Sequence, residues 1–264
     1  MAGHSKWKQI KRAKGVTDAK RGQTFTKIAR EITVAARLGL PDPDSNFRLR
    51  IAIQKARAEN MPNENIKRAL DRAGSEGGGG NYDEIYYEGY GPNGIALIVK
   101  ALTDNRNRTV GEVRAVFTRG GGTMGESGSV AFLFDQVGQI TVKTKGADVD
   151  ELTLQAIDAG AQDIRTDNAE AEEDPSIDVI TVPTELKLVQ DALEAQGLEI
   201  EDAQIVMQPK AQMALPEADT LKAMRLIERL EDLDDVQEVY SNLEVSEEIM
   251  AQVRWRVGVV GEWA

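Results

Sequence analysis

The sequence contains no cysteine and a single histidine, His4. Without cysteine the chain forms no disulfide, no thiolate metal site and no cysteine nucleophile, and one histidine cannot supply a cluster of imidazole ligands. The sequence identifies neither a nucleophile nor an orienting carboxylate near His4, so a catalytic role has no support. We therefore expect a protein that is not an enzyme and has no catalytic residues.

Long hydrophobic runs are also missing. Apolar runs such as Ile95–Val99 are far shorter than the roughly 20 residues that a membrane-spanning helix needs. The basic N-terminal segment is not followed by an apolar stretch, which argues against a secretory signal. Hydrophobic residues make up 41%, charged residues 29% and aromatic residues 5%, a composition typical of soluble globular proteins. We expect a cytoplasmic protein.

Two further patterns give no support to a metal or cofactor. The acidic runs 170–174 and 228–235 lack the spacing of an EF-hand loop, and we interpret them as a loop and a solvated helix end. Gly120–Gly125 fits G-x-G-x-x-G, but the expected order is helix before and strand after, the reverse of a dinucleotide site. We expect no metal and no cofactor, and a mobile glycine-rich loop that carries Arg119.

Charge is present but unevenly distributed. The net charge is −12, yet residues 1–75 contain 17 Lys+Arg against 7 Asp+Glu, and the other 189 residues contain 15 against 37. One end of such a chain attracts polyanions and the other end repels them. The sequence therefore predicts nucleic-acid binding that is confined to the N-terminal end.

Hydrophobic periodicity predicts helices over 17–38, 46–58 and 63–73, the last with Asn63 as N-cap. The four glycines of 77–80 follow, and we expect a hinge-like linker there. Beyond it the pattern changes to alternating strands and helices. Strands are expected over 82–90, 95–102, 130–134, 140–143, 177–182, 198–207 and 236–240, and helices from near Asn107 to Gly120 and over 148–159, 184–196 and 219–230.

These elements predict an α+β protein of three domains, an N-terminal helical domain followed by two small α/β sandwich domains, one inserted in the other. The expected boundaries are 1–75 for the basic helical domain, 76–80 for the linker, 81–137 plus 208–246 for one α/β domain, 138–207 for the inserted α/β domain and 247–264 for a C-terminal tail. Periodicity leaves open whether the α/β domains have separate sheets or one continuous sheet.

The candidate nucleic-acid-binding residues cluster near the N-terminus, where Asp18 is the only acidic neighbour. They are Lys6, Trp7, Lys8, Lys11, Arg12, Lys14, Lys20, Arg21, Lys27 and Arg30. Cations in such excess bind a phosphate backbone by releasing its counterions, and Trp7 could stack on a base. The alternative is a solvated basic tail in which Trp7 serves as a packing anchor.

A second candidate contact is the start of the helix after residue 105. Arg106 and Arg108 precede a helix N-terminus, where backbone N–H groups favour an anion. The alternative is that Asn and Thr side chains cap this helix and the two arginines pair with acidic residues around them. Both interpretations remain open at the level of the sequence, and Arg119 is a further candidate.

Five segments carry a resemblance to a known family: MAGHSKW at 1–7, DAKRGQTFTKIAREI at 18–32, YEGYGPNG at 87–94, DNRNRTVGEVR at 104–114 and DDVQEVYSN at 234–242. In this order they resemble the YebC/PmpR family of transcriptional regulators and translation activators. The resemblance implies a three-domain α/β protein without a cofactor that acts as a DNA-binding transcriptional regulator. Residues 254–264 run past the expected end of the family pattern.

Two functions share these electrostatics. One is a DNA-binding transcriptional regulator that holds a duplex through the helical domain, and the family name favours it. The other is a ribosome-associated translation factor that binds rRNA and assists elongation or peptide-bond formation. The lack of a recognisable helix-turn-helix favours RNA. The expected partner is nucleic acid, either DNA or rRNA in the ribosome, and neither a membrane nor a small-molecule substrate is indicated.

Overall fold

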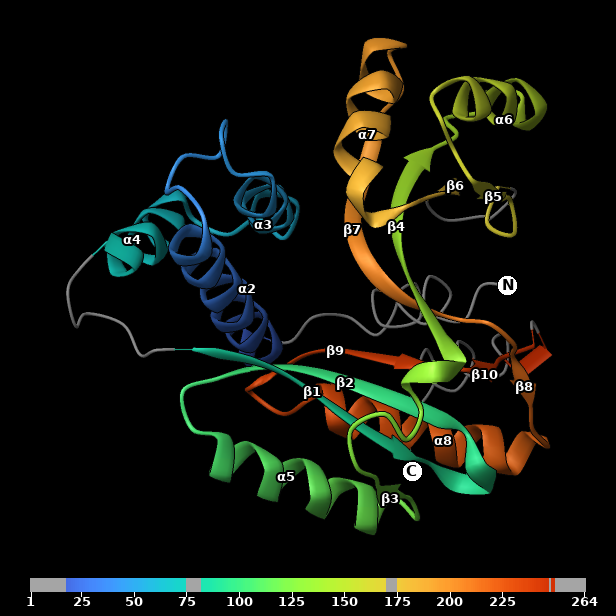
Figure 1. Ribbon diagram of the computed structural model, residues 1–264. Coiled ribbons are helices and arrows are strands. Elements are labelled where there is room, and N and C mark those ends of the chain that lie inside the picture. The colour runs from blue at the N-terminus through green and yellow to red at the C-terminus, as the bar shows by residue number, and fades with distance from the viewer. Residues whose placement is uncertain (1–17, 75–81, 170–174, 247, 250–264) are drawn as a thin grey trace. The chain divides into compact units, whose positions relative to one another are not determined.

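The structure is a computed structural model of the chain and describes residues 18–74, 82–169, 175–246 and 248–249. The chain divides into two compact units (Figure 1): one comprises residues 135–208, and the other comprises the described residues before 135 and after 208. The glycine linker predicted at 76–80 and the tail at 254–264 lie outside the described residues.

The described chain begins with three helices, α2 (Asp18–Leu38), α3 (Phe47–Ala58) and α4 (Asn63–Gly74). Their apolar faces meet in one core that contains Ile32, Leu49 and Ile66. These helices lie within one residue of the predicted ranges, because each has a buried face at three- and four-residue steps. The third differs in one detail: Asn63 is its first helical residue and not its cap.

Asn46 fixes the turn between α2 and α3. Its Oδ1 accepts a hydrogen bond from the Leu49 N–H at 3.1 Å, which caps α3. Its Nδ2 donates to the carbonyl oxygens of Ala35 at 2.7 Å and Leu40 at 2.8 Å. One buried side chain therefore ends the first helix and begins the second.

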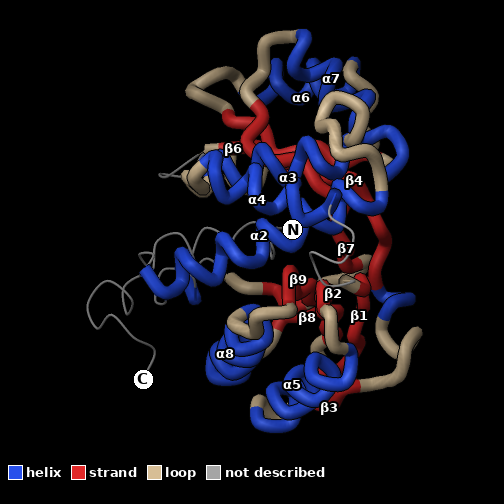
Figure 2. Tube along the Cα trace, turned by 90° about the vertical axis from the view of Figure 1, so that its left-hand side faces the viewer, coloured by secondary structure: helices blue, strands red, loops and turns tan. Residues whose placement is uncertain are grey.

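The same unit contains a four-stranded sheet in the order β3-β1-β2-β9. The strands are β1 (Asp83–Tyr90), β2 (Ala96–Thr103), β3 (Thr123–Met124) and β9 (Val236–Ser241), all paired antiparallel. Helices α5 (Arg106–Arg119) and α8 (Glu217–Glu231) cover one face, where Val99, Phe117 and Met224 are buried. The helices α2 and α3 lie on the opposite face (Figure 2). A short parallel pair, β8 (Met213–Ala214) with β10 (Leu243–Glu244), completes the unit.

The unit at 135–208 has its own sheet in the order β5-β6-β4-β7. Its strands are β4 (Phe134–Lys143), β5 (Asp163–Arg165), β6 (Ser176–Thr181) and β7 (Ile200–Pro209), and its helices are α6 (Val149–Asp158) and α7 (Leu186–Ala195). Ile140, Val179 and Leu193 are buried in this unit. The two sheets are therefore separate, and the α+β class expected from the sequence is confirmed.

The strand predicted over 130–134 is wrong. Residues Ala131–Leu133 form a 3-10 turn, and β4 begins only at Phe134. The cause is the buried carboxylate of Glu88, which accepts hydrogen bonds from the backbone N–H groups of Gly128 at 2.7 Å and of Val130 and Ala131 at 2.8 Å each. Donors held by a carboxylate are not available to a strand ladder.

The glycine-rich segment 120–125 is also not the free loop that the sequence suggested. Its Thr123–Met124 pair forms β3 against Tyr90 and Gly89 of β1. Gly122 lies so close to the Tyr90 carbonyl oxygen that an added Cβ would be 2.6 Å from it. The glycines here permit close packing of backbone on backbone, and not the approach of a cofactor phosphate.

We predict that Glu88→Gln lowers the free energy of unfolding by about 1–3 kcal/mol at neutral pH, because an amide cannot accept all three backbone hydrogen bonds. Burial alone would raise the pKa of Glu88, but these three bonds outweigh it and lower the pKa. A carboxyl whose folded pKa is lowered stabilises the protein above its unfolded pKa of about 4.3, and this stabilisation is lost as the pH falls through the folded pKa.

Urea unfolding of both proteins at several pH values checks this expectation. The difference between wild type and variant should shrink as the pH falls below the unfolded pKa and through the lowered folded pKa, because Glu88 then becomes protonated in the folded wild type as well. Glu112→Gln, an exposed position on α5, is the matched control. Equal losses from the two substitutions would contradict a special role for Glu88.

Candidate nucleic-acid interface

Six of the predicted binding residues lie outside the described residues: Lys6, Trp7, Lys8, Lys11, Arg12 and Lys14. Lys20 belongs to α2, but its side chain is not described. Arg21, one residue further along α2, is exposed and has no ion pair within the described part of the chain. Side-chain contacts can therefore be described for the remaining candidates, which lie between Lys27 and Arg119.

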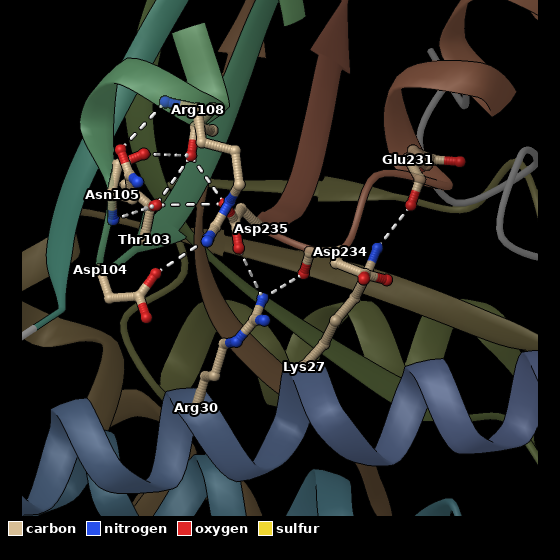
Figure 3. A network of polar contacts seen from close by, with 10 residues as sticks. Lys27, Arg30, Thr103, Asp104, Asn105, Arg108, Glu231, Asp234 and Asp235 are labelled. Atoms are coloured by element: carbon tan, nitrogen blue, oxygen red, sulfur yellow. Dashed lines mark hydrogen bonds and ion pairs between the residues drawn. The ribbon is translucent and has the colours of Figure 1, made fainter. Parts of the chain in front are cut away.

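Lys27 and Arg30 contact the turn between α8 and β9 (Figure 3). Lys27 Nζ donates to the carbonyl oxygen of Glu231, and Arg30 Nη1 donates to that of Asp234. Arg30 also pairs with the carboxylate of Asp235 at 3.1 Å, and the two side chains are only 16% and 3% exposed. These two cations join the helical part, which consists of α2, α3 and α4, to the turn before β9. They do not point outward as the sequence suggested.

Asp235 is the centre of this network. Its Oδ2 accepts hydrogen bonds from the hydroxyl groups of Thr109 at 2.7 Å and Thr103 at 3.1 Å, and from Arg108 Nη2 at 2.7 Å (Figure 3). Burial alone would raise the pKa of Asp235. The bonds from Thr109 and Arg108 and the charge of Arg30 outweigh burial and lower this pKa, so the carboxylate is charged at neutral pH.

The start of α5 is occupied by the chain's own side chains. Asn105 is the N-cap, two residues before the position predicted, and its Oδ1 accepts from the Arg108 N–H at 3.1 Å. Arg106 pairs with Asp83 at 2.7 Å, and Arg108 pairs with Asp104 at 2.9 Å as well as with Asp235. The arrangement matches the second of the two interpretations left open by the sequence, in which these arginines pair with nearby carboxylates.

Arg119 ends α5 and is exposed, with its Nε donating to the carbonyl oxygen of Ala115 at 3.1 Å. No described side chain joins it to the helical part. The structure thus does not bring Arg106, Arg108 and Arg119 together with the cations of α2 into one surface. Arg106 and Arg108 form ion pairs within the sheet and its helices, whereas Lys27 and Arg30 join α2 to the turn between α8 and β9.

Two cations of α3 make the same kind of docking contact. Arg48 pairs with Glu31 of α2 at 2.9 Å and with Glu84 of β1, and these two carboxylates raise the pKa of Arg48 although burial opposes them. Lys55 pairs with Glu238 of β9 at 3.6 Å. The pairs with Glu84 and Glu238 join α3 to the sheet, so cations of α3 neutralise carboxylates on the face of the sheet that α3 covers.

Three exposed cations on α3 and α4 were missed as candidates: Arg57, Lys67 and Arg68. None of them makes an ion pair within the described residues. The sequence did contain a signal for them, because the basic excess extends to residue 75 and not only to residue 30. Arg21, Arg57 and Lys67 form the outward set of cations, which faces solvent, whereas Arg68 lines a groove between α2 and α4.

No described helix is of a length and apolarity that would let it span a membrane. Within the described ranges, no three His, Asp or Glu side chains are grouped so that they could hold a metal ion. The features that do gather are cations, and they gather on the helical part.

Comparison with known proteins gives matches over nearly the whole chain. Residues 5–76 match the family described as TACO1/YebC protein N-terminal domain, and residues 82–243 match TACO1/YebC second and third domain. A relative from Herpetosiphon aurantiacus, named probable transcriptional regulatory protein, is 54% identical over 250 residues, which are 94% of this chain and 97% of the relative. A relative of the same name from Persephonella marina is 52% identical over 254 residues, covering 96% of this chain and 100% of the relative.

A solved structure is similar as well. The crystal structure of a conserved hypothetical protein from Aquifex aeolicus has a TM-score of 0.79 and 45% sequence identity, and the match covers 88% of this chain and 93% of that one. At this identity the two chains share their fold.

We predict that Asp235→Asn lowers the free energy of unfolding by about 3–5 kcal/mol, because it leaves Arg30 and Arg108 without their shared buried counterion. Asp234→Asn is the matched control: its side chain is exposed, and the carbonyl group that accepts from Arg30 is retained. Thermal and urea unfolding of the two variants measure the difference. A similar, small loss in both variants would show that Asp235 does not hold the network together.

Proposed function

The chain belongs to the TACO1/YebC family, and from this premise we propose that it is a cytoplasmic, DNA-binding transcriptional regulator that binds phosphates through its helical part. The relatives' name, probable transcriptional regulatory protein, supports regulation of transcription as the process. The proposal includes no catalytic step.

The observation that carries the proposal is the division of charge. Residues 1–75 have ten more basic than acidic side chains, and the rest of the chain has 22 more acidic than basic ones. A duplex approaches such a protein at the protein's basic end, because the acidic remainder repels phosphates. Some cations of the helical part are paired with the chain's own carboxylates, but Arg21, Arg57 and Lys67 are exposed. In this proposal they add to the positive charge of the basic segment 1–17.

Binding of this kind is carried by phosphates and is largely independent of base sequence. In the translation-factor alternative the same cations bind rRNA. The two functions differ in which nucleic acid, duplex DNA or rRNA, the protein binds more tightly. A duplex and a looped rRNA fragment of similar charge, compared at physiological salt, make that distinction. Stronger binding to the RNA would favour the alternative.

We predict that the triple variant Arg21→Gln, Arg57→Gln and Lys67→Gln binds duplex DNA at least about 10-fold more weakly at about 0.1 M salt. The slope of log affinity against log salt should fall by up to about three units, because each cation that contacts a phosphate releases about one counterion. Fluorescence anisotropy across a salt series measures both quantities.

The matched control removes the same charge from the acidic remainder, by Lys145→Gln, Lys187→Gln and Lys222→Gln. These lysines are exposed and lie far along the sequence from the helical part. The control should change affinity by less than about 2-fold. Equal losses from the two triple variants would mean that only net charge matters and would overturn the proposed interface.

A further inference from the structure

A groove of about 420 Å³ lies between α2 and α4, with Tyr82 at one side. Its volume falls in the range of small-ligand sites, about 300–1,000 Å³. The two helices lie side by side, as the hydrogen bond from Thr33 Oγ1 to the Ala69 carbonyl oxygen at 3.0 Å shows (Figure 1). The side chains that decide its chemistry are Phe25, Arg30, Asn65, Arg68, Arg72 and Tyr82.

The helical period explains why these side chains face the groove. On α4, Asn65, Arg68 and Arg72 follow one another at steps of three and four residues and therefore share one face. On α2, Phe25 and Ala29 share a face in the same way, and the small residues Gly22 and Ala29 leave space between the helices. The groove is thus set by the sequence of two helices that pack firmly on each other.

The groove combines guanidinium groups with aromatic rings. Arg30, Arg68 and Arg72 contribute to its wall, and no Asp or Glu stands among the described residues that line it. Arg68 is exposed and makes no ion pair within the described part of the chain. The guanidinium carbon of Arg30 lies 5.9 Å from the centroid of the Tyr82 ring, a distance at which a cation and a ring attract each other. The ion pair with Asp235 holds the Arg30 guanidinium in place beside the Tyr82 ring.

Each of these groups suits one part of a nucleotide. A guanidinium binds phosphate with two parallel hydrogen bonds, aromatic rings stack on bases of any sequence, and the Asn65 amide offers both donors and an acceptor to a base edge. A base within a duplex is stacked on its neighbours and cannot enter a groove between helices, whereas an unpaired base can.

We propose that this groove binds one unpaired nucleotide of a single-stranded or looped nucleic acid, with the base against Phe25 and Tyr82 and a phosphate on Arg68. The inference rests on the proposed function in that it takes nucleic acid to be the partner. It adds a second mode of contact: phosphates of any strand meet the outward cations, and an unpaired base enters the groove.

The test compares the full-length protein and its variants on a fluorescent oligothymidylate of about 12 nucleotides and on the same strand in a duplex. Phe25→Leu and Arg68→Gln should each weaken binding of the single strand about 5- to 20-fold and binding of the duplex by less than about 2-fold. Lys67→Gln is the reference variant, because Lys67 is an exposed neighbour of Arg68 that does not line the groove. It should weaken both probes alike.

The outcomes separate this inference from the proposed function. If Phe25→Leu has no effect and Arg68→Gln weakens both probes as Lys67→Gln does, the groove is not a nucleotide site although the helical part still binds phosphates. If the wild type binds neither probe, both proposals are wrong. An oligouridylate run beside oligothymidylate shows whether RNA or DNA supplies the nucleotide. Tighter capture of a phosphotyrosyl peptide than of either strand would assign the groove to a protein partner and overturn the inference.

A second measurement does not depend on variants that must fold. An oligonucleotide containing 5-iodouridine is irradiated on the wild-type protein, and the adduct is mapped after trypsin digestion. We expect the adduct on the peptide that contains Phe25 or on the peptide that contains Tyr82. An adduct confined to the peptide with Trp7 would place base stacking on the N-terminal segment and would overturn the groove.

Discussion

The buried carboxylate of Asp235 is the constraint on which the rest of the larger unit depends. It accepts hydrogen bonds from Thr103 at the end of β2 and from Thr109 of α5. It also forms ion pairs with Arg108 of α5 and Arg30 of α2. A carboxylate with 3% of its side chain exposed is costly unless charge and hydrogen bonds compensate for its lost hydration. Since the compensating groups come from three different elements, the sheet, its helix and the helical part must all be in place for this charge to be tolerated.

The same principle divides the cations of the helical part into two sets. Lys27, Arg30, Arg48 and Lys55 contact acidic residues or carbonyl groups of the unit's own sheet and turns. The outward set has no such contact among the described residues. A basic helical domain can therefore pack against an acidic sheet and still keep cations for an external polyanion, because different faces of the helices serve the two purposes.

The sequence predicts the elements better than the contacts between them. Helices α2, α3 and α4 and strands β1 and β2 follow from local periodicity, which needs no knowledge of distant residues. The failures involve partners that lie far apart in the chain. Residues 130–134 lose their strand to Glu88, more than forty positions away, and Asp235 belongs to an acidic run that was expected to be solvated but is 2% exposed. For Arg106 and Arg108 the sequence left two interpretations open, phosphate contact or pairing with nearby carboxylates, and only the fold shows which carboxylates lie near them.

The two sets of cations also respond differently to salt. Ions screen exposed charges over a Debye length of about 8 Å at physiological strength, but they screen partly buried pairs much less. The pair of Arg30 with Asp235 is largely buried, with side chains 16% and 3% exposed, whereas Arg57 and Lys67 face solvent. In the proposed interface, rising salt would therefore release phosphates from the outward cations before it loosened the docking of α2 on the sheet. A base held by stacking in the proposed groove would depend least on salt, since its attraction to a ring is not a contact between net charges.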